Sequence, residues 1–193
     1  TGYLDGEMVS VTSTGMGGPS AAICLEELIH AGAETFIRVG TCGRICEESY
    51  NKKYEGVVIT GAIRHEGTTV QYIPIEYPAM ADRHVTEALV QSAEEQGFCF
   101  AEGVAQCKDS FYGQHDPDSM PNGFMLKSYW EAWEKAGVMA SEMESATVFI
   151  VSAIRGKRAG ALMAYEHMNE NTIKTAIGAI KKLIKLDRMQ SEK

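Results

Sequence analysis

The stretch STGMGGPSAA, Ser13 to Ala22, places three glycines within four residues, between a strand-like run and a helix-like run. The preceding residues, MVSVTST, alternate apolar and polar side chains as a strand does, and Pro19 suits the first turn of the helix that follows. Glycine allows positive φ and close approach of a ligand to the main chain, while a helix N-terminus directs free N–H groups at the same place. The stretch therefore predicts a phosphate or sugar site at the carboxyl end of a sheet strand, with a ligand-free tight turn as the structural alternative.

Runs typical of strands and of helices alternate along the rest of the chain. Strands are expected at residues 35–40, 56–64, 98–107, 137–141 and 158–165, and helices at residues 20–32, 82–97, 126–137, 142–156 and 171–187. The intervening loop-like segment, residues 112–123, is rich in Gly, Pro, Asp and Asn. This alternation predicts an α/β fold with three layers, α/β/α, around a mostly parallel, mixed central sheet. Because no linker or internal repeat is visible, we expect a single domain over residues 1–193.

Two of the expected helices carry further signals. Asp82 and Gly97 stand where the N-cap and the end of one helix should lie. The last helix places four isoleucines on one stripe, with lysines opposite: Ile173, Ile177, Ile180 and Ile184. Such a stripe is typical of a helix that packs on the core and turns its charged face to solvent.

The composition argues against several classes of protein. The net charge is −8 with no block of like charge, which disfavours a nucleic-acid-binding surface. No apolar run reaches membrane-spanning length, and no signal peptide is visible. The five cysteines are odd in number and form no C-x-x-C pair. We therefore expect reduced thiols, no metal site and a cytoplasmic location.

Arg38 lies in a short apolar strand, where an unpartnered guanidinium is costly to bury. A buried carboxylate is one candidate partner, and an anionic ligand held by the guanidinium fork is the other. The residues that follow, GTCG, add Thr41 and Gly43 at the next strand end. The chain lacks the Gly-Lys-Ser/Thr of a Walker loop, and Arg38 stands near where a dinucleotide fold needs an acidic residue. The combination favours a phosphate site.

Several segments resemble the nucleoside phosphorylase family, which includes uridine phosphorylase and the hexameric purine nucleoside phosphorylases. They are STGMGGPSAAICLEEL, FIRVGTCG, SEMESA and CKDSFYGQH, the last similar to the uridine branch. The resemblance runs from Gly2 to about Arg158 and starts after the family's N-terminal phosphate-binding segment, so we expect a chain truncated relative to the family. It implies reversible phosphorolysis: phosphate attacks the anomeric carbon of a nucleoside and releases the base and ribose 1-phosphate, without a metal or organic cofactor.

The resemblance also implies roles for individual residues. By position in these segments, the phosphate ligands are Gly15, Gly17, Arg38 and Thr41, the ribose ligands Thr41, Met143 and Glu144, and the base ligands Phe111, Gln114, Lys108 and His115. Lys108 and His115 are included because Asp116 stands where the family commonly has a base-binding arginine. Arg38 and Glu144 are the expected catalytic residues, since phosphate and the Glu144 carboxylate favour a cationic ribose in the transition state. Arg44 is considered as a further cation near the phosphate.

At the level of the whole protein, the resemblance implies a uridine-cleaving pentosyltransferase that assembles as a homo-oligomer, a hexamer or a dimer. Its partners are the nucleoside and phosphate, with neither nucleic acid nor membrane. The competing functions are a purine nucleoside phosphorylase, a nucleoside hydrolase of the same fold and an inactive nucleoside-binding subunit. Arg38 argues against the hydrolase, which needs no cation for phosphate.

Each residue also has a purely structural interpretation. Ser141 and Glu144 form an S-x-x-E pattern, which is typical of a capping box at a helix start. Core packing would account for Met143, Phe111 and Tyr112, and a solvent-exposed position would account for Lys108 and His115.

Overall fold

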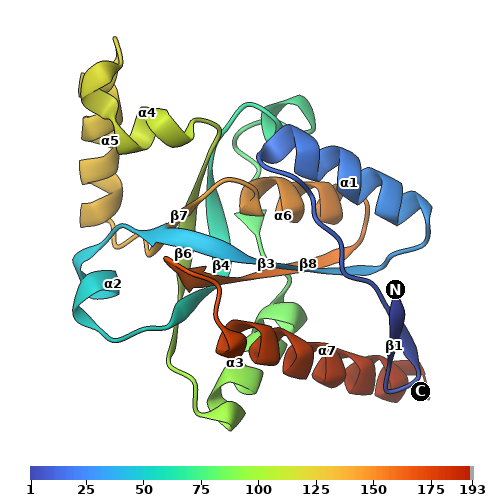
Figure 1. Ribbon diagram of the computed structural model, residues 1–193. Helices are drawn as coiled ribbons and strands as arrows, with labels where there is room; N and C mark the ends of the chain where they lie inside the picture. The colour runs from blue at the N-terminus through green and yellow to red at the C-terminus, as the bar shows by residue number, and fades with distance from the viewer. Residues whose placement is uncertain (192–193) are drawn as a thin grey trace.

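A mixed six-stranded sheet forms the centre of the molecule in the computed structural model, which describes residues 1–191 (Figure 1). Its strands are β3 (Thr35–Arg44), β4 (Gly56–His65), β5 (Ala79–Met80), β6 (Phe100–Lys108), β7 (Ala140–Glu142) and β8 (Arg158–Tyr165), in the order β5-β4-β6-β7-β3-β8. The long pairings β3–β8 and β4–β6 are parallel, as is β6–β7, whereas β3–β7, β4–β5 and β4–β8 are antiparallel. The extra β4–β8 pairing closes β4, β6, β7, β3 and β8 into a ring, and β5 is attached to β4 outside it.

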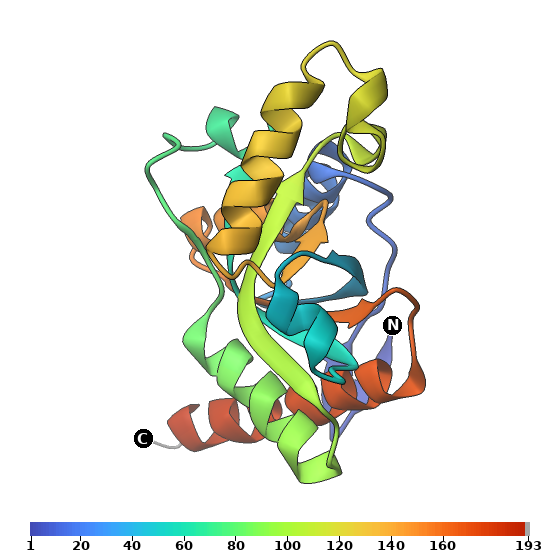
Figure 2. The same cartoon turned by 90° about the vertical axis from the view of Figure 1, so that its left-hand side faces the viewer.

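Helices cover both faces of this sheet. They are α1 (Gly18–His30), α2 (Glu47–Asn51), α3 (Arg83–Gln96), α4 (Phe111–His115), α5 (Gly123–Lys135), α6 (Ser145–Ile154) and α7 (Glu170–Ser191), with short 3₁₀ turns at Thr69–Gln71 and Pro117–Ser119. α6 lies on one face with α1 behind it, and α3 and α7 cover the other face (Figures 1 and 2). The expected three-layer α/β/α architecture with a mixed sheet is confirmed.

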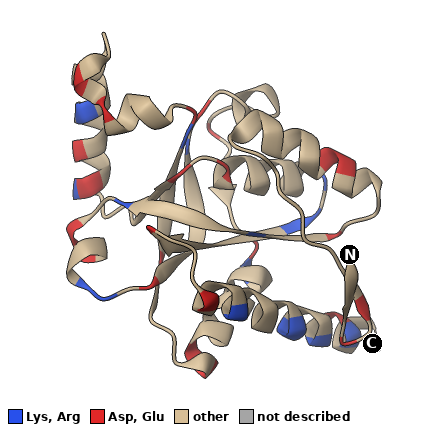
Figure 3. Cartoon of the chain, in the orientation of Figure 1, with Lys and Arg blue, Asp and Glu red and all other residues tan. Residues whose placement is uncertain are grey.

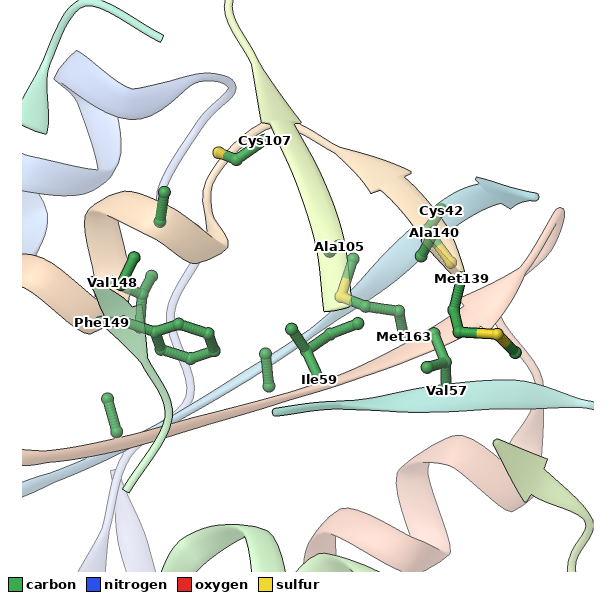
Figure 4. Close-up of a cluster of buried hydrophobic side chains, with 14 of the residues drawn as sticks. Cys42, Val57, Ile59, Ala105, Cys107, Met139, Ala140, Val148, Phe149 and Met163 are labelled. Atoms are coloured by element: carbon green, nitrogen blue, oxygen red, sulfur yellow. The ribbon is translucent and has the colours of Figure 1, made fainter. Parts of the chain in front are cut away.

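Two apolar clusters hold the layers together. The larger lies between the sheet and α6 and is built around Phe149, Ile59 and Met163 (Figure 4). The smaller packs Val58 and Leu162 from the other face of the sheet against α3 and α7. The side chains at the centre of both clusters are buried, so burial of apolar surface is the main force that joins strands and helices.

The helix caps follow the sequence closely. The Asp82 carboxylate accepts hydrogen bonds from the N–H groups of His84 (2.9 Å) and Val85 (3.1 Å) at the start of α3. Gly97 ends the same helix with φ at 72°, in the left-handed region. Pro19 lies in the first turn of α1.

The strand expected before the glycine stretch is wrong in extent and place. Glu7–Val9 forms β2, which pairs only with β1 (Gly2–Leu4) in a separate hairpin. Asp5 and Gly6 both adopt positive φ (49° and 86°), which lets the chain turn back on itself at once. Residues 10–16 have no regular structure, so the glycine stretch does not end a strand of the central sheet.

Two further expectations are corrected. Of the expected stripe, Ile184 is buried and Ile180 partly buried, but Ile173 and Ile177 are exposed. The rest of the buried face of α7 consists of Thr172, Thr175, Ala176, Ala179 and Leu183. Small side chains let α7 approach α3 closely: a Cβ on Gly178 would lie 2.2 Å from Ser92 Oγ. The first four residues of the expected loop, 112–115, belong to helix α4 (Phe111–His115), whose start is capped because Ser110 Oγ accepts a hydrogen bond from the Gly113 N–H (3.0 Å).

The charged residues and the cysteines lie where the composition led us to expect them: no long run of like charge forms in residues 1–191, and the thiols are unpaired. Both acidic and basic residues lie along α5, and basic residues gather on α7 (Figure 3). The five cysteines are unpaired, and Cys42, Cys46 and Cys107 are buried. Within residues 1–191, no helix has the length and apolar character required to cross a membrane.

Candidate active site

Arg38 on β3 is held by two buried carboxylates. Its Nε donates to Glu142 Oε2 (3.0 Å) and its Nη2 to Glu144 Oε2. Burial lowers the pKa of Arg38, but the two carboxylates outweigh it and raise the pKa above its ordinary value. The structure therefore realises the carboxylate alternative for Arg38. Nη1 makes no hydrogen bond within the described residues, so one edge of the guanidinium is still available to an anion.

Glu142 is a site residue that sequence reasoning missed. Besides Arg38, its Oε2 accepts hydrogen bonds from the N–H groups of Glu144 (2.9 Å) and Ser145 (2.8 Å), at the start of α6. Its Oε1 is buried without a hydrogen-bond partner among residues 1–191. A signal was present in the sequence, because two glutamates two residues apart after a strand can turn to the same side.

The glycine stretch reaches the site through Glu144. The Gly17 N–H donates to Glu144 Oε1 at 2.5 Å, and Gly17 has φ at 85°. Gly15 is exposed with φ at 72°, and a Cβ there would lie 2.6 Å from Ser20 Oγ, which donates to the Thr14 carbonyl. The capping-box interpretation of Ser141 and Glu144 is wrong, since the Glu144 side chain makes no cap to α6. It ties the glycine stretch to Arg38 instead.

A second polar cluster surrounds the Ser141 hydroxyl. Lys108 Nζ donates to Ser141 Oγ at 2.5 Å, and Gln114 Nε2 lies 2.9 Å from the same atom. Ser141 Oγ in turn donates to Gln106 Oε1 at 2.7 Å. Burial lowers the pKa of Lys108, against the opposing effect of Glu142. Lys108 is thus buried, not at the surface, while Ser141 and Gln106 are further residues that the sequence did not single out for this site.

This second cluster opens onto a hollow of about 530 Å³. Its polar lining includes Lys108, Gln106 and Gln114, together with the carboxylates of Asp109, Glu131 and Glu134. Trp130 and Trp133 on α5, the only tryptophans of the sequence, line it as well. A hollow with mostly apolar walls and a few convergent polar groups is typical of a small-molecule site.

The remaining expected residues lie nearer the surface. Phe111 and Tyr112 are exposed and do not line the hollow, so their assignment to the core is wrong. His115 lies beside the Phe111 ring, 4.2 Å between ring centroids, and burial and then Lys108 lower its pKa. Thr41 is exposed on β3, and Met143 is partly buried between the two glutamates.

Arg44 does not serve this site. Its guanidinium donates to the carbonyls of Ser49 and Tyr54 and lies over the Tyr165 ring, 3.8 Å from the centroid. Arg44 therefore holds α2 and the residues after it against β8. These contacts do not support a role for Arg44 as a further cation near the phosphate. In the part of the chain that the structure describes, no three His, Cys, Asp or Glu side chains gather as metal ligands do.

Comparison with known proteins places these residues in a family. The sequence profile of the phosphorylase superfamily matches residues 1–185. The chain is 46% identical to a uridine phosphorylase of Treponema pallidum, over 97% of this chain and 78% of that protein. It is 42% identical to a uridine phosphorylase of Klebsiella aerogenes (81% and 62%) and 39% identical to a guanosine phosphorylase of Halorubrum lacusprofundi (82% and 60%). The chain thus spans about three fifths of the latter two relatives. With matches of this extent, the chain belongs to the phosphorylase superfamily.

Proposed function

We propose that this protein catalyses the reversible phosphorolysis of a pyrimidine nucleoside, with uridine as its main substrate. In this reaction a phosphate oxygen attacks C1′ of the ribose, the bond from C1′ to the base breaks, and the electron pair leaves with the base. The products are ribose 1-phosphate and uracil. The similar uridine phosphorylases of Treponema pallidum and Klebsiella aerogenes support this choice of substrate.

One observation carries the proposal: residues 141–144 join the two polar clusters. Glu142 and Glu144 hold Arg38, while Ser141 meets Lys108 and Gln114 at the hollow. A ribose near this segment would have a phosphate cation on one side and donors for a base on the other. That is the order in which the phosphate, sugar and base of a phosphorolysis must be arranged.

Each group then has a physical task. Phosphate meets Nη1 of Arg38, which makes no hydrogen bond within residues 1–191. By the family resemblance, Thr41 and the main chain at Gly15 and Gly17 are its further proposed ligands. Glu144 accepts from the ribose hydroxyls and, with phosphate, stabilises positive charge on the ribose. Lys108 and Gln114 donate to the oxygens of uracil and stabilise its developing negative charge. By the family resemblance, Met143 is a further proposed contact to the ribose, and Phe111 and His115, which lie outside the lining of the hollow, are further proposed contacts to the base. Neither metal nor organic cofactor has a part.

Phosphate dependence is the first test. The chain is incubated with uridine, deoxyuridine, thymidine and guanosine, with and without phosphate, and release of the base and ribose 1-phosphate is measured. Release of uracil only with phosphate supports the proposal. Equal rates without phosphate indicate a hydrolase, and uridine binding by calorimetry without turnover indicates an inactive binding subunit. Faster turnover of guanosine than of uridine favours a purine enzyme.

Arg38→Lys tests the phosphate site. Lysine keeps the charge but loses the planar fork, so we expect kcat/KM for phosphate to fall about a hundredfold, the size typical of one lost transition-state donor. Arg158→Lys is the matched control, because Arg158 also pairs with a carboxylate, Asp187 at 2.7 Å, but on the opposite side of the sheet beside α7. An unchanged phosphate dependence in Arg38→Lys would remove Arg38 from the site.

Location and assembly belong to the same proposal. We propose a cytoplasmic enzyme that works as a homo-oligomer, a dimer or hexamer. Unpaired cysteines, three of them buried, suit a reducing compartment. Light scattering of the purified chain, measured with and without uridine and phosphate, tests the assembly.

A further inference from the structure

We propose that Ser141 is a positioning residue, which holds Lys108 and Gln114 in the orientation that recognises the base. Gln106, which is hydrogen-bonded to the Ser141 hydroxyl, holds Ser141 in place. The inference rests on the proposed function, since it concerns how the same site selects its base. It assigns a role to a hydroxyl that the sequence pattern suggested only as a helix cap.

The hydrogen-bonding capacity of Ser141 is fully used. A serine hydroxyl offers one donor and two acceptor positions. Two acceptors lie within reach of its proton, Gln106 Oε1 at 2.7 Å and Gln114 Oε1 at 3.1 Å, and we assign the proton to the nearer one, Gln106. Ser141 Oγ then accepts from Lys108 Nζ (2.5 Å) and Gln114 Nε2 (2.9 Å). Ser141, Lys108 and Gln106 are 4%, 5% and 1% exposed, so water does not compete for these bonds. Such a saturated, buried network holds its members in one geometry.

The direction of the bonds is set from the far end. Gln106 Nε2 lies 3.5 Å from His65 Nδ1, and His65 is packed against Tyr129 and Trp133 at centroid distances of 5.1 and 4.9 Å. If His65 is neutral and accepts at Nδ1, the Gln106 amide must point its Nε2 at His65. The other atom of the amide, Oε1, then faces Ser141. Ser141 must then give its proton to Gln106 and present its lone pairs to Lys108 and Gln114.

This direction determines which bases fit. Lys108 spends one N–H on Ser141 and makes no other hydrogen bond to residues 1–191, although it lines the hollow. The remaining ammonium donors suit a carbonyl oxygen and not an exocyclic amino group. In our proposal Lys108 faces the 4-position of a pyrimidine, where uracil and thymine carry an acceptor oxygen and cytosine carries an amino group, so the site should take uracil and thymine and reject cytosine.

Ser141 also supports the charge of Lys108. Burial lowers the pKa of Lys108, and a hydrogen bond that Ser141 accepts favours the ammonium form. The charged or titratable groups that act on Lys108 are Glu142, Glu144, Cys107, Cys42 and His115. None of them changes in a Ser141→Ala variant, so the effect of the hydroxyl can be isolated.

The variant Ser141→Ala distinguishes a role of Ser141 in positioning Lys108 from a general role in the stability of the fold. We expect KM for uridine to rise about tenfold, the effect of one lost hydrogen bond to a charged group, with KM for phosphate unchanged. Discrimination against cytidine should weaken. The alkaline limb of the pH profile of kcat/KM should move to lower pH, because the ammonium loses an acceptor and its pKa falls further. Ser141→Thr restores the hydroxyl and should recover most of the affinity and the pH profile.

Controls keep the outcomes distinct. Ser119→Ala removes an exposed serine that bonds only to the Asp116 carbonyl, and should leave every parameter unchanged. The pKa of Lys108 is also read directly by NMR on lysine-labelled protein, with Lys108→Gln used to assign the signal. Ser141→Ala should lower that pKa whether or not turnover occurs.

Two results would overturn the inference. One is an active Ser141→Ala protein with wild-type KM for uridine and a wild-type pH profile. The other is an unshifted Lys108 signal in Ser141→Ala. Absence of phosphate-dependent cleavage by the wild-type chain contradicts the proposed function instead. If, in addition, the Lys108 signal does not shift when uracil is added, base recognition by Lys108 and Gln114 is contradicted as well.

Discussion

Arg38 shows how one side chain serves structure and chemistry together. The two glutamates that neutralise it also fix its orientation, so a phosphate would meet a guanidinium already aimed. Gly40 makes this possible: a Cβ there would lie 2.9 Å from Arg38 Nη1 and 3.0 Å from Met163 Cε. A glycine at this position therefore keeps open the edge of Arg38 that the proposed phosphate uses.

Gly40→Ala should impair phosphate use without unfolding the protein. Met163 Cε is the end of a flexible side chain, but the Arg38 guanidinium is fixed by Glu142 and Glu144. We therefore expect a loss of stability of about 1–3 kcal/mol and a rise in KM for phosphate of about tenfold. Steady-state kinetics and urea unfolding measure the two effects. Gly43→Ala, on the same strand with nothing within 4 Å of the new Cβ, is the control. Equal effects of both variants would contradict this explanation.

His65 should make stability depend on pH. Burial lowers its pKa below the ordinary 6.5, although Asp109 acts in the opposite direction. The unfolded chain then binds the proton more readily, so the stability contributed by neutral His65 is present above pH 6.5 and is lost as the pH falls through the lowered pKa. Urea midpoints from about pH 7.5 to about pH 5.5 should fall less in His65→Gln than in wild type. His30→Gln, at an exposed position, should retain the wild-type slope.

Among individual residues, the sequence allowed the charged members of the candidate site to be predicted better than its hydroxyl and amide members. Arg38 stood out because a cation in an apolar strand must have a partner, and Glu144 followed from the family resemblance. Ser141 and Gln106 are ordinary polar residues in two different strands, and only the pairing of β6 with β7 brings them together. That pairing is a property of the fold, which no local pattern contains.

Among the elements, α7 shows where periodicity misleads. Its isoleucine stripe predicted the buried face only in part: Ile184 is buried, but Ile173 and Ile177 are exposed, and the helix turns threonine, alanine and Leu183 toward the sheet and α3. Close packing between α3 and α7 favours small side chains, and this tertiary requirement overrides the apolar pattern. α3 was predicted correctly because Asp82 and Gly97 mark its ends by local hydrogen bonding and backbone conformation.

Substitutions on α7 can distinguish the two faces. Leu183→Ala should destabilise the protein by about 2–5 kcal/mol, since it leaves a cavity in the smaller cluster. Ile177→Ala should change the stability by no more than about 0.5 kcal/mol, because that side chain is 43% exposed. Urea unfolding of both variants provides the measurement. A comparable loss in Ile177→Ala would mean that the isoleucine stripe is covered in solution.

For the molecule as a whole, closure of the sheet is the feature that the sequence did not predict. Alternating strands and helices indicated the layers, but the β4–β8 pairing joins distant segments in antiparallel order. Gly56 lies at this junction, where a Cβ would come 2.1 Å from the Met163 carbonyl oxygen. The absence of a side chain at this position therefore allows two main chains to meet.

Gly56→Ala should be among the most damaging single methyl additions in this protein. Main chain cannot move aside as a side chain can, so we expect a loss of about 3 kcal/mol or more. Gly43→Ala is again the control, with an expected change within about 1 kcal/mol. Chemical unfolding followed by circular dichroism measures both. A mild effect of Gly56→Ala would argue that the β4–β8 junction is looser than described.

Both indole rings of the protein border the hollow, on one helix, which makes them natural reporters of binding. Fluorescence excited beyond the tyrosine band arises from Trp130 and Trp133 alone. Quenching by a nucleobase would therefore report occupancy of this one place, so a dissociation constant can be obtained by simple titration, without a label, a coupled enzyme or turnover.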